Sequence, residues 1–454
     1  MKTKGVHESS SSSGNTSTTQ HQRTGITLLI LVCFFLSGAT ALIYEILWMR
    51  LISRILGGAP FAVSTILVVF MGGLGIGSLL AGRKVDGIEH SRLIRVYGFL
   101  ELGIGLYALC VPLLLWLIKW LYIASYDRLF EYTLFYNLLI FAGALTVLCL
   151  PAICMGATLP LLCRFYVESL GELGTHSGRL YGLNTIGGAA GSLICGFWLI
   201  AAFGVYGAML AAVCINIAIG LACTRAGKST QTFRSATATS KSSKENGPPP
   251  SPEARALHNY AKPLLPATEK SSLPPSQRTG ALVIFAVSGF CAMAYEVLWT
   301  KLLGLMIGPT TYSFTIVLVT FIVGLALGNM VFCLWADRTR NVFRLLVLTQ
   351  AVAALSALGV SQLMGQSQLF FAKLLYTFSD SFALQSLTKA LTLFAFMMIP
   401  TFFLGACFPL AIKIYTQSIS RVGNAIGVAY AVNTAGAVAG SFLAGFVLIP
   451  FLGK

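Results

Sequence analysis

One stretch of the chain occurs twice, and this repeat constrains the fold more than any other feature. It reads SGATALIYEILWMRLISRILG over residues 37–57 and SGFCAMAYEVLWTKLLGLMIG over residues 288–308. An ionisable Tyr-Glu pair inside an apolar run is costly in lipid, so its presence indicates a structural or functional role. Because the pair recurs in the same context, the sequence predicts two homologous halves.

The composition places both halves in a membrane. Of the 454 residues, 56% are hydrophobic and 10% are charged, whereas a soluble protein has about 25% charged residues. Apolar runs of about 20 residues recur, each long enough to cross a hydrocarbon core about 30 Å thick. We therefore expect an all-α, polytopic membrane protein in a lipid bilayer. The expected spans lie near 26–48, 61–82, 94–118, 134–162, 178–201, 204–223, 281–303, 311–335, 343–364, 388–412 and 425–450.

Polar segments divide the chain into four parts. We expect a disordered tail over 1–25, a first transmembrane repeat over 26–224, a flexible linker over 225–280 and a second repeat over 281–454. Most Lys and Arg residues lie in the tail, the linker and the loops of one side, which predicts a cytoplasmic N-terminus in the cell (inner or plasma) membrane. Six spans before the linker make the halves parallel repeats, as in a major facilitator.

The second repeat is shorter than the first. Asn184 is followed by a further apolar run from Phe203, whereas its counterpart Asn433 is followed only by residues up to Lys454. The expected architecture is thus major facilitator-like with its last helix missing, which suggests a fragment or a truncated product.

The net charge of +16 does not indicate a nucleic-acid partner, because the basic residues lie in loops between spans. The eleven Cys residues are scattered, nearly all in apolar runs, and form no C-x-x-C pair. They are expected to be small buried side chains. We therefore expect neither a metal nor a cofactor.

The repeated Tyr-Glu stretch offers a candidate binding site. On a helix, Glu45 shares a face with Gly38, which lets another helix approach closely. In the functional interpretation, Glu45 and Glu296 are carboxylates in a cavity that binds a cation, with aromatic side chains as cation–π walls. Those aromatic residues are Tyr44, Tyr295, Trp48 and Trp299. In the structural interpretation, Glu45 pairs with Arg50, Arg54 or a polar group of another span.

A further carboxylate lies in the third span. Glu101 belongs to the run GFLELGIGLYAL, and its counterpart in the second half is the uncharged Gln350. It is either a second acid of the same cavity or a buried, hydrogen-bonded structural residue.

The second span of each half combines glycines with a trailing aspartate. Gly-x-x-x-Gly over 73–77 and over 324–328 predicts a helix-packing face, and a dinucleotide site is disfavoured because no strand precedes the run and the run lies inside a membrane span. Asp86 and Asp337 follow, the latter next to Arg338. This arrangement resembles the cytoplasmic loop motif of major facilitators, and it is expected to tie neighbouring helices together at that surface.

Taken together, the doubled SG-x5-YE-x-LW-x-[RK] signature, the glycine-rich second span and the P-x4-G-x3-P fourth span resemble membrane-bound spermidine synthase-like proteins. The resemblance implies a membrane domain that anchors polyamine synthesis and binds or transports polyamines or related amines. In that family an aminopropyltransferase domain follows the last span. No such domain is present in this chain, so an enzymatic activity stays uncertain and no catalytic residue is assigned. The alternative is a stand-alone facilitator-like secondary transporter of an unknown small molecule.

Overall fold

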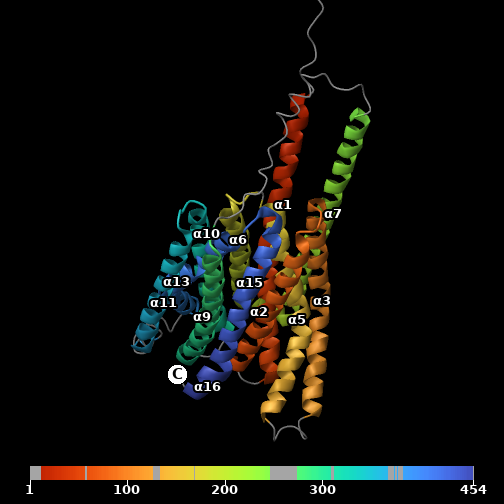
Figure 1. Ribbon diagram of the computed structural model, residues 1–454. Coiled ribbons are helices and arrows are strands. Elements are labelled where there is room, and N and C mark those ends of the chain that lie inside the picture. Colours follow the sequence, from red (N-terminus) through yellow and green to blue (C-terminus); the bar gives the residue numbers. More distant parts are fainter. Residues whose placement is uncertain are drawn as a thin grey trace, which may run out of the picture.

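The computed structural model describes residues 12–56, 59–125, 133–167, 169–245, 273–307, 311–366, 373, 376 and 382–452. Within these residues the chain is helical throughout, and no strand occurs, so the predicted all-α class is confirmed. The first half contains α1 (Ser12–Leu56), α2 (Ala59–Val85), α3 (His90–Ala124), α5 (Thr133–Tyr166), α6 (Leu173–Ile194), the π-helix η1 (Cys195–Leu199) and α7 (Ile200–Glu245) (Figure 1). The second half contains α9 (Pro275–Ile307), α10 (Thr311–Ala336), α11 (Val342–Gln366), α13 (Phe382–Gly405), α14 (Cys407–Tyr415), the short η2 (Ile419–Arg421), α15 (Val422–Phe442), the π-helix η3 (Leu443–Leu448) and α16 (Ile449–Leu452).

Ten segments of the described chain are long and apolar enough to cross a membrane. One of them, Leu173–Lys228, has 56 residues. At 1.5 Å per residue it would be about 84 Å long, more than twice the hydrocarbon core. Its backbone leaves the helical conformation at Gly204, where φ is 68°, a value that glycine adopts readily. The segment therefore supplies two crossings, as predicted, and the chain is a multi-pass membrane protein.

The ends of two helices reach into segments that were expected to be irregular. Helix α1 begins at Ser12, inside the predicted tail, and α7 continues to Glu245, inside the predicted linker. Residues 1–11 and 246–272 lie outside the described residues, so the division of the chain into tail, repeats and linker stays a prediction.

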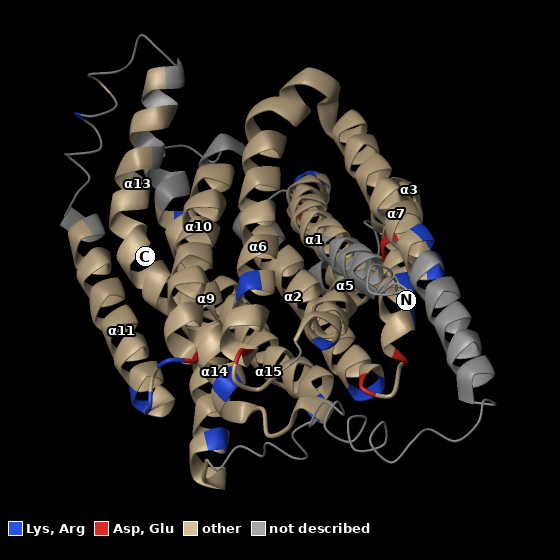
Figure 2. Ribbon diagram, turned by 90° about the horizontal axis from the view of Figure 1, so that it is seen from above, with Lys and Arg blue, Asp and Glu red and all other residues tan. Residues whose placement is uncertain are grey.

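Apart from Glu45, Glu101 and Glu296, which are buried, most charged residues lie at the ends of the bundle. Figure 2 shows Lys, Arg, Asp and Glu mainly on loops and helix ends, with tan helices between them. Asp86 follows α2 and Asp337 follows α10, and both lie at the end where α6 and α15 begin. We call this end the aspartate end, and the other the opposite end.

Within each half, the repeated stretch packs against one particular helix. Gly38 of α1 lies directly on the backbone of Asn184 in α6, and Gly289 of α9 lies in the same way on Asn433 in α15. The Asn184 side chain donates a hydrogen bond to the carbonyl oxygen of Phe34 (3.0 Å), and its counterpart Asn433 does the same in the second half. The amides therefore hold close-packed helices together, which is how polar groups often serve in membranes.

The glycine faces of the second spans also pack as predicted. Gly77 of α2 lies against the carbonyl of Ile153 in α5, and Gly328 of α10 lies against the carbonyl of Phe402 in α13. Small residues let the two backbones approach, and close packing replaces the hydrophobic force that lipid does not provide between helices.

Each half packs one of its helices against a helix of the other half. Helix α2 of the first half packs along α15 of the second, and α10 of the second half packs along α6 of the first. Figure 1 shows α6, α15 and α2 in the middle of the bundle, with α9, α11 and α13 on one side and α3, α5 and α7 on the other. Helices α1 and α9, which contain the two repeated stretches, border the space between the halves.

Gly38→Ala tests the close approach of α1 and α6. The added methyl group would overlap the carbonyl oxygen of Asn184, and overpacking of this kind costs about 1–3 kcal/mol. We expect a lower melting temperature of the purified protein in detergent. Gly103→Ala in α3 is the matched control, because no atom lies within 4 Å of the added carbon. Equal melting temperatures for the two variants would contradict the packing assignment.

Candidate functional site

A cavity of about 200 Å³ lies between the two halves. Its walls come from equivalent positions of the two repeats, so that most lining residues occur in related pairs. The polar and aromatic pairs are Ser37 and Ser288, Glu45 and Glu296, Phe34 and Phe285, Phe70 and Phe321, Tyr181 and Tyr430, Asn184 and Asn433, and Thr185 and Thr434. The cavity is therefore a property of the assembled halves and not of either half alone.

Two of the predicted site residues, Glu45 and Glu296, line this cavity together. Their side chains are 1% and 3% exposed, and one carboxyl oxygen of each, Oε1, is fully buried without a hydrogen-bond partner. The pairing of Glu45 with Arg50 or Arg54, the structural alternative, is not among the ion pairs of the described residues.

The four predicted aromatic residues do not border the cavity. Tyr44 stacks on Trp48 with ring centroids 5.3 Å apart, and Tyr295 stacks on Trp299 at the same distance. Both indoles are fully buried in the hydrophobic core, and each packs edge-on against a phenylalanine of the following helix. These phenylalanines, Phe70 and Phe321, are the rings that reach the cavity. Each Tyr-Trp pair thus packs in the core against the phenylalanine that borders the cavity.

Glu101 lies outside the cavity lining, in a polar cluster inside the first half. Its Oε1 accepts a hydrogen bond from the Ser37 hydroxyl and its Oε2 accepts one from the Asn216 amide, both at 2.6 Å. The Tyr44 hydroxyl donates to the other end of the Asn216 amide at 2.9 Å. The cluster joins α1, α3 and α7, which supports the structural interpretation of Glu101. Ser37 belongs both to this cluster and to the cavity wall.

Asp86 connects the two halves at the aspartate end. Its carboxylate accepts hydrogen bonds from the backbone N–H groups of Gly423 (3.0 Å) and Asn424 (2.9 Å) in the first turn of α15. Arg164, in the last turn of α5, lies 3.5 Å from the same carboxylate. The first N–H groups of a helix have no partner within the helix, and a negative charge there is favoured by the helix dipole.

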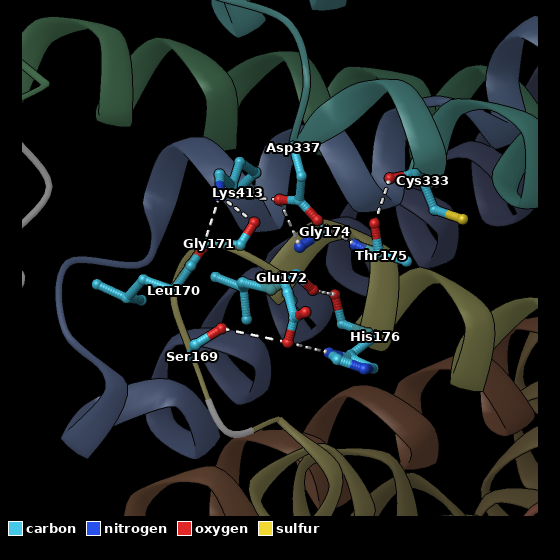
Figure 3. Close-up of polar contacts among 12 residues, drawn as sticks. Ser169, Leu170, Gly171, Glu172, Gly174, Thr175, His176, Cys333, Asp337 and Lys413 are labelled. Carbon is cyan, nitrogen blue, oxygen red and sulfur yellow. Dashed lines mark hydrogen bonds and ion pairs between the residues drawn. The ribbon is translucent and has the colours of Figure 1, made fainter. Parts of the chain in front are cut away.

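Asp337 makes the equivalent connection in the other direction. It accepts hydrogen bonds from the N–H groups of Gly174 (3.2 Å) and Thr175 (2.7 Å) at the start of α6, and it pairs with Lys413 at 2.8 Å. Figure 3 shows Lys413 also donating to the backbone of the loop before α6, at Leu170 (2.6 Å). Arg338, predicted as part of this motif, is exposed, and the ion pair is made by Lys413 instead.

The sequence analysis did not identify the basic residues that form ion pairs with the two aspartates, although the repeat indicates them. Arg164 and Lys413 occupy equivalent positions near the ends of the fourth spans, and Gly174 and Gly423 are equivalent as well. The motif was predicted to act locally, whereas each aspartate contacts a helix of the opposite half. The residues that form each of these contacts lie far apart in the sequence, so their spacing does not indicate that they meet.

Contacts between the halves also close the opposite end. Gly196 of η1 lies against Thr315 of α10, and its counterpart Gly445 of η3 lies against Ser64 of α2. Both glycines sit in π-helical turns, which are uncommon and are often found at functional sites. The cavity therefore lies between two sets of contacts, one at each end.

Among the residues that the structure describes, no three His, Cys, Asp or Glu side chains gather as a metal site would require. The cavity walls supply carboxylates, amides, hydroxyls and aromatic rings.

Of three comparisons with known proteins, only the comparison with solved structures finds a similar protein. No family model matches the chain. No curated protein matches its sequence. Among solved structures, the chain is similar to the major facilitator superfamily proton:xylose symporter XylE bound to 6-bromo-6-deoxy-D-glucose. The identity is 12% and the TM-score 0.47, over 94% of this chain and 88% of the symporter chain, so the likeness concerns the fold alone.

The resemblance to spermidine synthase-like proteins is wrong, and with it the anchoring of polyamine synthesis and the transport of polyamines. No comparison returns a protein of that family, and the solved structure that is returned is a symporter of the major facilitator superfamily. The motifs behind the resemblance have a physical explanation in helix packing. Gly38 and Gly77 let helices approach, and the Tyr-Trp pairs fill the core behind the cavity. Packing requirements of this kind do not specify an attached enzyme.

Gln350→Glu tests the asymmetry of the polar clusters. Gln350 donates a hydrogen bond to the carbonyl of Phe403 at 3.2 Å, and a carboxylate there would face that oxygen without a donor. Leaving such a group unsatisfied costs about 1–3 kcal/mol or more, so we expect a lower melting temperature. Gln362→Glu, at an exposed position of the same helix, is the control. Glu101→Gln should be milder than Gln350→Glu, because the Ser37 hydroxyl can turn to accept a hydrogen bond. The opposite order would contradict these roles.

Proposed function

We propose that the chain is a facilitator-like secondary transporter, which carries a small molecule across the membrane by exposing the central cavity to each side in turn. The observation that carries this proposal is the cavity itself, which lies between the halves and is lined by equivalent residues of both. A ligand held there contacts both halves at once. Movement of one half against the other would then open the cavity without dismantling either half.

The contacts at the two ends support this mechanism. Asp86 and Asp337 hold the halves together at the aspartate end, and the glycine turns at 196 and 445 hold them together at the opposite end. Because each set crosses between the halves, breaking either set would open the cavity on that side alone. In the described conformation both sets of contacts are made.

The aspartate end is assigned to the cytoplasm in this proposal. Most of the 31 Lys and Arg residues lie in the predicted tail, in the predicted linker and in loops of this end, which favours a cytoplasmic N-terminus in the cell (inner or plasma) membrane. The repeats 26–224 and 281–454 would then enter the membrane in the same sense, joined by the linker over 225–280.

Hydrogen–deuterium exchange of the protein in nanodiscs tests alternating access. Asp86→Asn together with Asp337→Asn weakens charge-assisted hydrogen bonds, each worth about 1.5–3 kcal/mol. We expect faster exchange in the first turns of α6 and α15. Exchange in the π-helical turns η1 and η3 should become slower, because a protein opened at one end spends less time open at the other.

The matched control is Glu89→Gln, which alters an exposed ion pair at the same end and should leave both regions unchanged. Faster exchange at both ends together would indicate simple loosening of the bundle and would contradict the proposal. Unchanged exchange at both ends would contradict it as well.

A further inference from the structure

The chemistry of the cavity wall identifies the class of ligand that it fits. Among the described residues that line the cavity there are two carboxyl groups and no Lys, Arg or His. An anionic ligand would therefore meet only repulsion. A carboxylate that is fully buried, without a partner, is strongly unfavourable unless a positive charge or a proton compensates it. The buried Oε1 atoms of Glu45 and Glu296 have no such partner within the described residues.

The remaining polar groups of the wall are largely engaged. The amides of Asn184 and Asn433 donate to backbone carbonyls of α1 and α9, and the hydroxyls of Thr185 and Thr434 donate to their own helices. The Ser37 hydroxyl donates to Glu101. A polyhydroxylated neutral ligand needs many directed donors and acceptors, whereas the donors of the wall that no described contact engages are the Tyr181 and Tyr430 hydroxyls and the second N–H of each amide.

Seven aromatic rings of the described residues line the cavity among a larger number of aliphatic side chains. Tyr181 and Tyr430, from equivalent positions of the two halves, meet with ring centroids 6.2 Å apart, and Tyr181 stacks on Phe408 at 4.2 Å. Phe70 of α2 and Phe321 of α10 also border the cavity. Rings of this kind attract a cation over their faces, most strongly where water is excluded.

The size of the cavity limits the ligand further. Its volume of about 200 Å³ is below the 300–1,000 Å³ of sites for drug-sized molecules and only slightly above that of a cavity that holds benzene. A molecule of drug size does not fit within it. The ligand must therefore be compact as well as positively charged.

From this geometry we infer that the cavity binds a compact organic cation whose charge is covered by alkyl groups, a quaternary ammonium, held between Glu45 and Glu296 beside the rings of Phe70 and Phe321. This inference rests on the proposed function, since it names the class of molecule that the transporter would carry. The two acidic side chains face the charge from opposite halves, one as the carboxylate that balances it and the other protonated, and the rings contact the alkyl groups. An alkylated cation suits such a wall, because it presents no N–H groups that require hydrogen-bond acceptors.

Equilibrium binding of choline to the full chain in nanodiscs tests the inference. The comparison ligand is 3,3-dimethyl-1-butanol, a neutral molecule of the same shape in which carbon replaces the charged nitrogen. We expect choline to bind at least about tenfold more tightly than this alcohol, since a tenfold ratio corresponds to about 1.4 kcal/mol of the attraction to charge and rings. Equal binding of the two molecules, or no binding of choline, would overturn the inference without any variant.

Variants locate the bound cation. Glu45→Gln and Glu296→Gln should each weaken choline binding about tenfold or more, and the double variant should abolish it. Glu172→Gln, which changes an exposed carboxylate outside the cavity, is the matched control and should bind like the unmodified protein. Unchanged binding in the double variant would overturn the assignment to these residues.

Equilibrium binding of choline needs the cavity to open at one end only and does not depend on alternation between the ends. Normal choline binding in a protein whose two ends open together would contradict alternating access and leave the ligand assignment standing. Reciprocal opening of the ends without choline binding would do the reverse.

Discussion

The structure depends on close contact between helix backbones. In lipid, apolar side chains gain little by leaving the solvent, so helices associate through packing and hydrogen bonds. Gly38 on Asn184 and Gly77 on Ile153 bring backbones together in the first half, and the same contacts recur in the second. The asparagine amides then add hydrogen bonds across each contact. These contacts fix where α1 and α9 stand, and hence where the two glutamates point.

Much of this arrangement follows from the sequence, and particular residues show why. The repeat predicted two homologous halves, the glycine spacing predicted the packing faces, and Glu45 and Glu296 stood out because a carboxylate is costly in an apolar helix. The side to which Tyr44 and Trp48 turn could not be predicted, because both faces of their helix are apolar. Docking of Asp86 onto α15 was equally inaccessible, since it joins residues more than 300 positions apart, through backbone groups that every residue has.

The two halves differ most clearly where a charge is buried. In the first half, Glu101 is surrounded by donors from α1 and α7, whereas Gln350 in the second half turns its amide to a backbone carbonyl. Through Ser37 the first cluster reaches the cavity wall. The cavity lining is thus nearly symmetric, whereas the buried polar contacts behind it differ between the two halves.

The exchange of contacts between halves has a consequence for the origin of the fold. Helix α10 is the counterpart of α2, and α15 is the counterpart of α6, so the two contacts between the halves are copies of a single one. A surface patch that meets its own copy twice around an axis is the interface of a symmetric dimer. Two identical copies of one half could therefore have paired in this way before their genes were joined, with one glutamate from each already facing the axis.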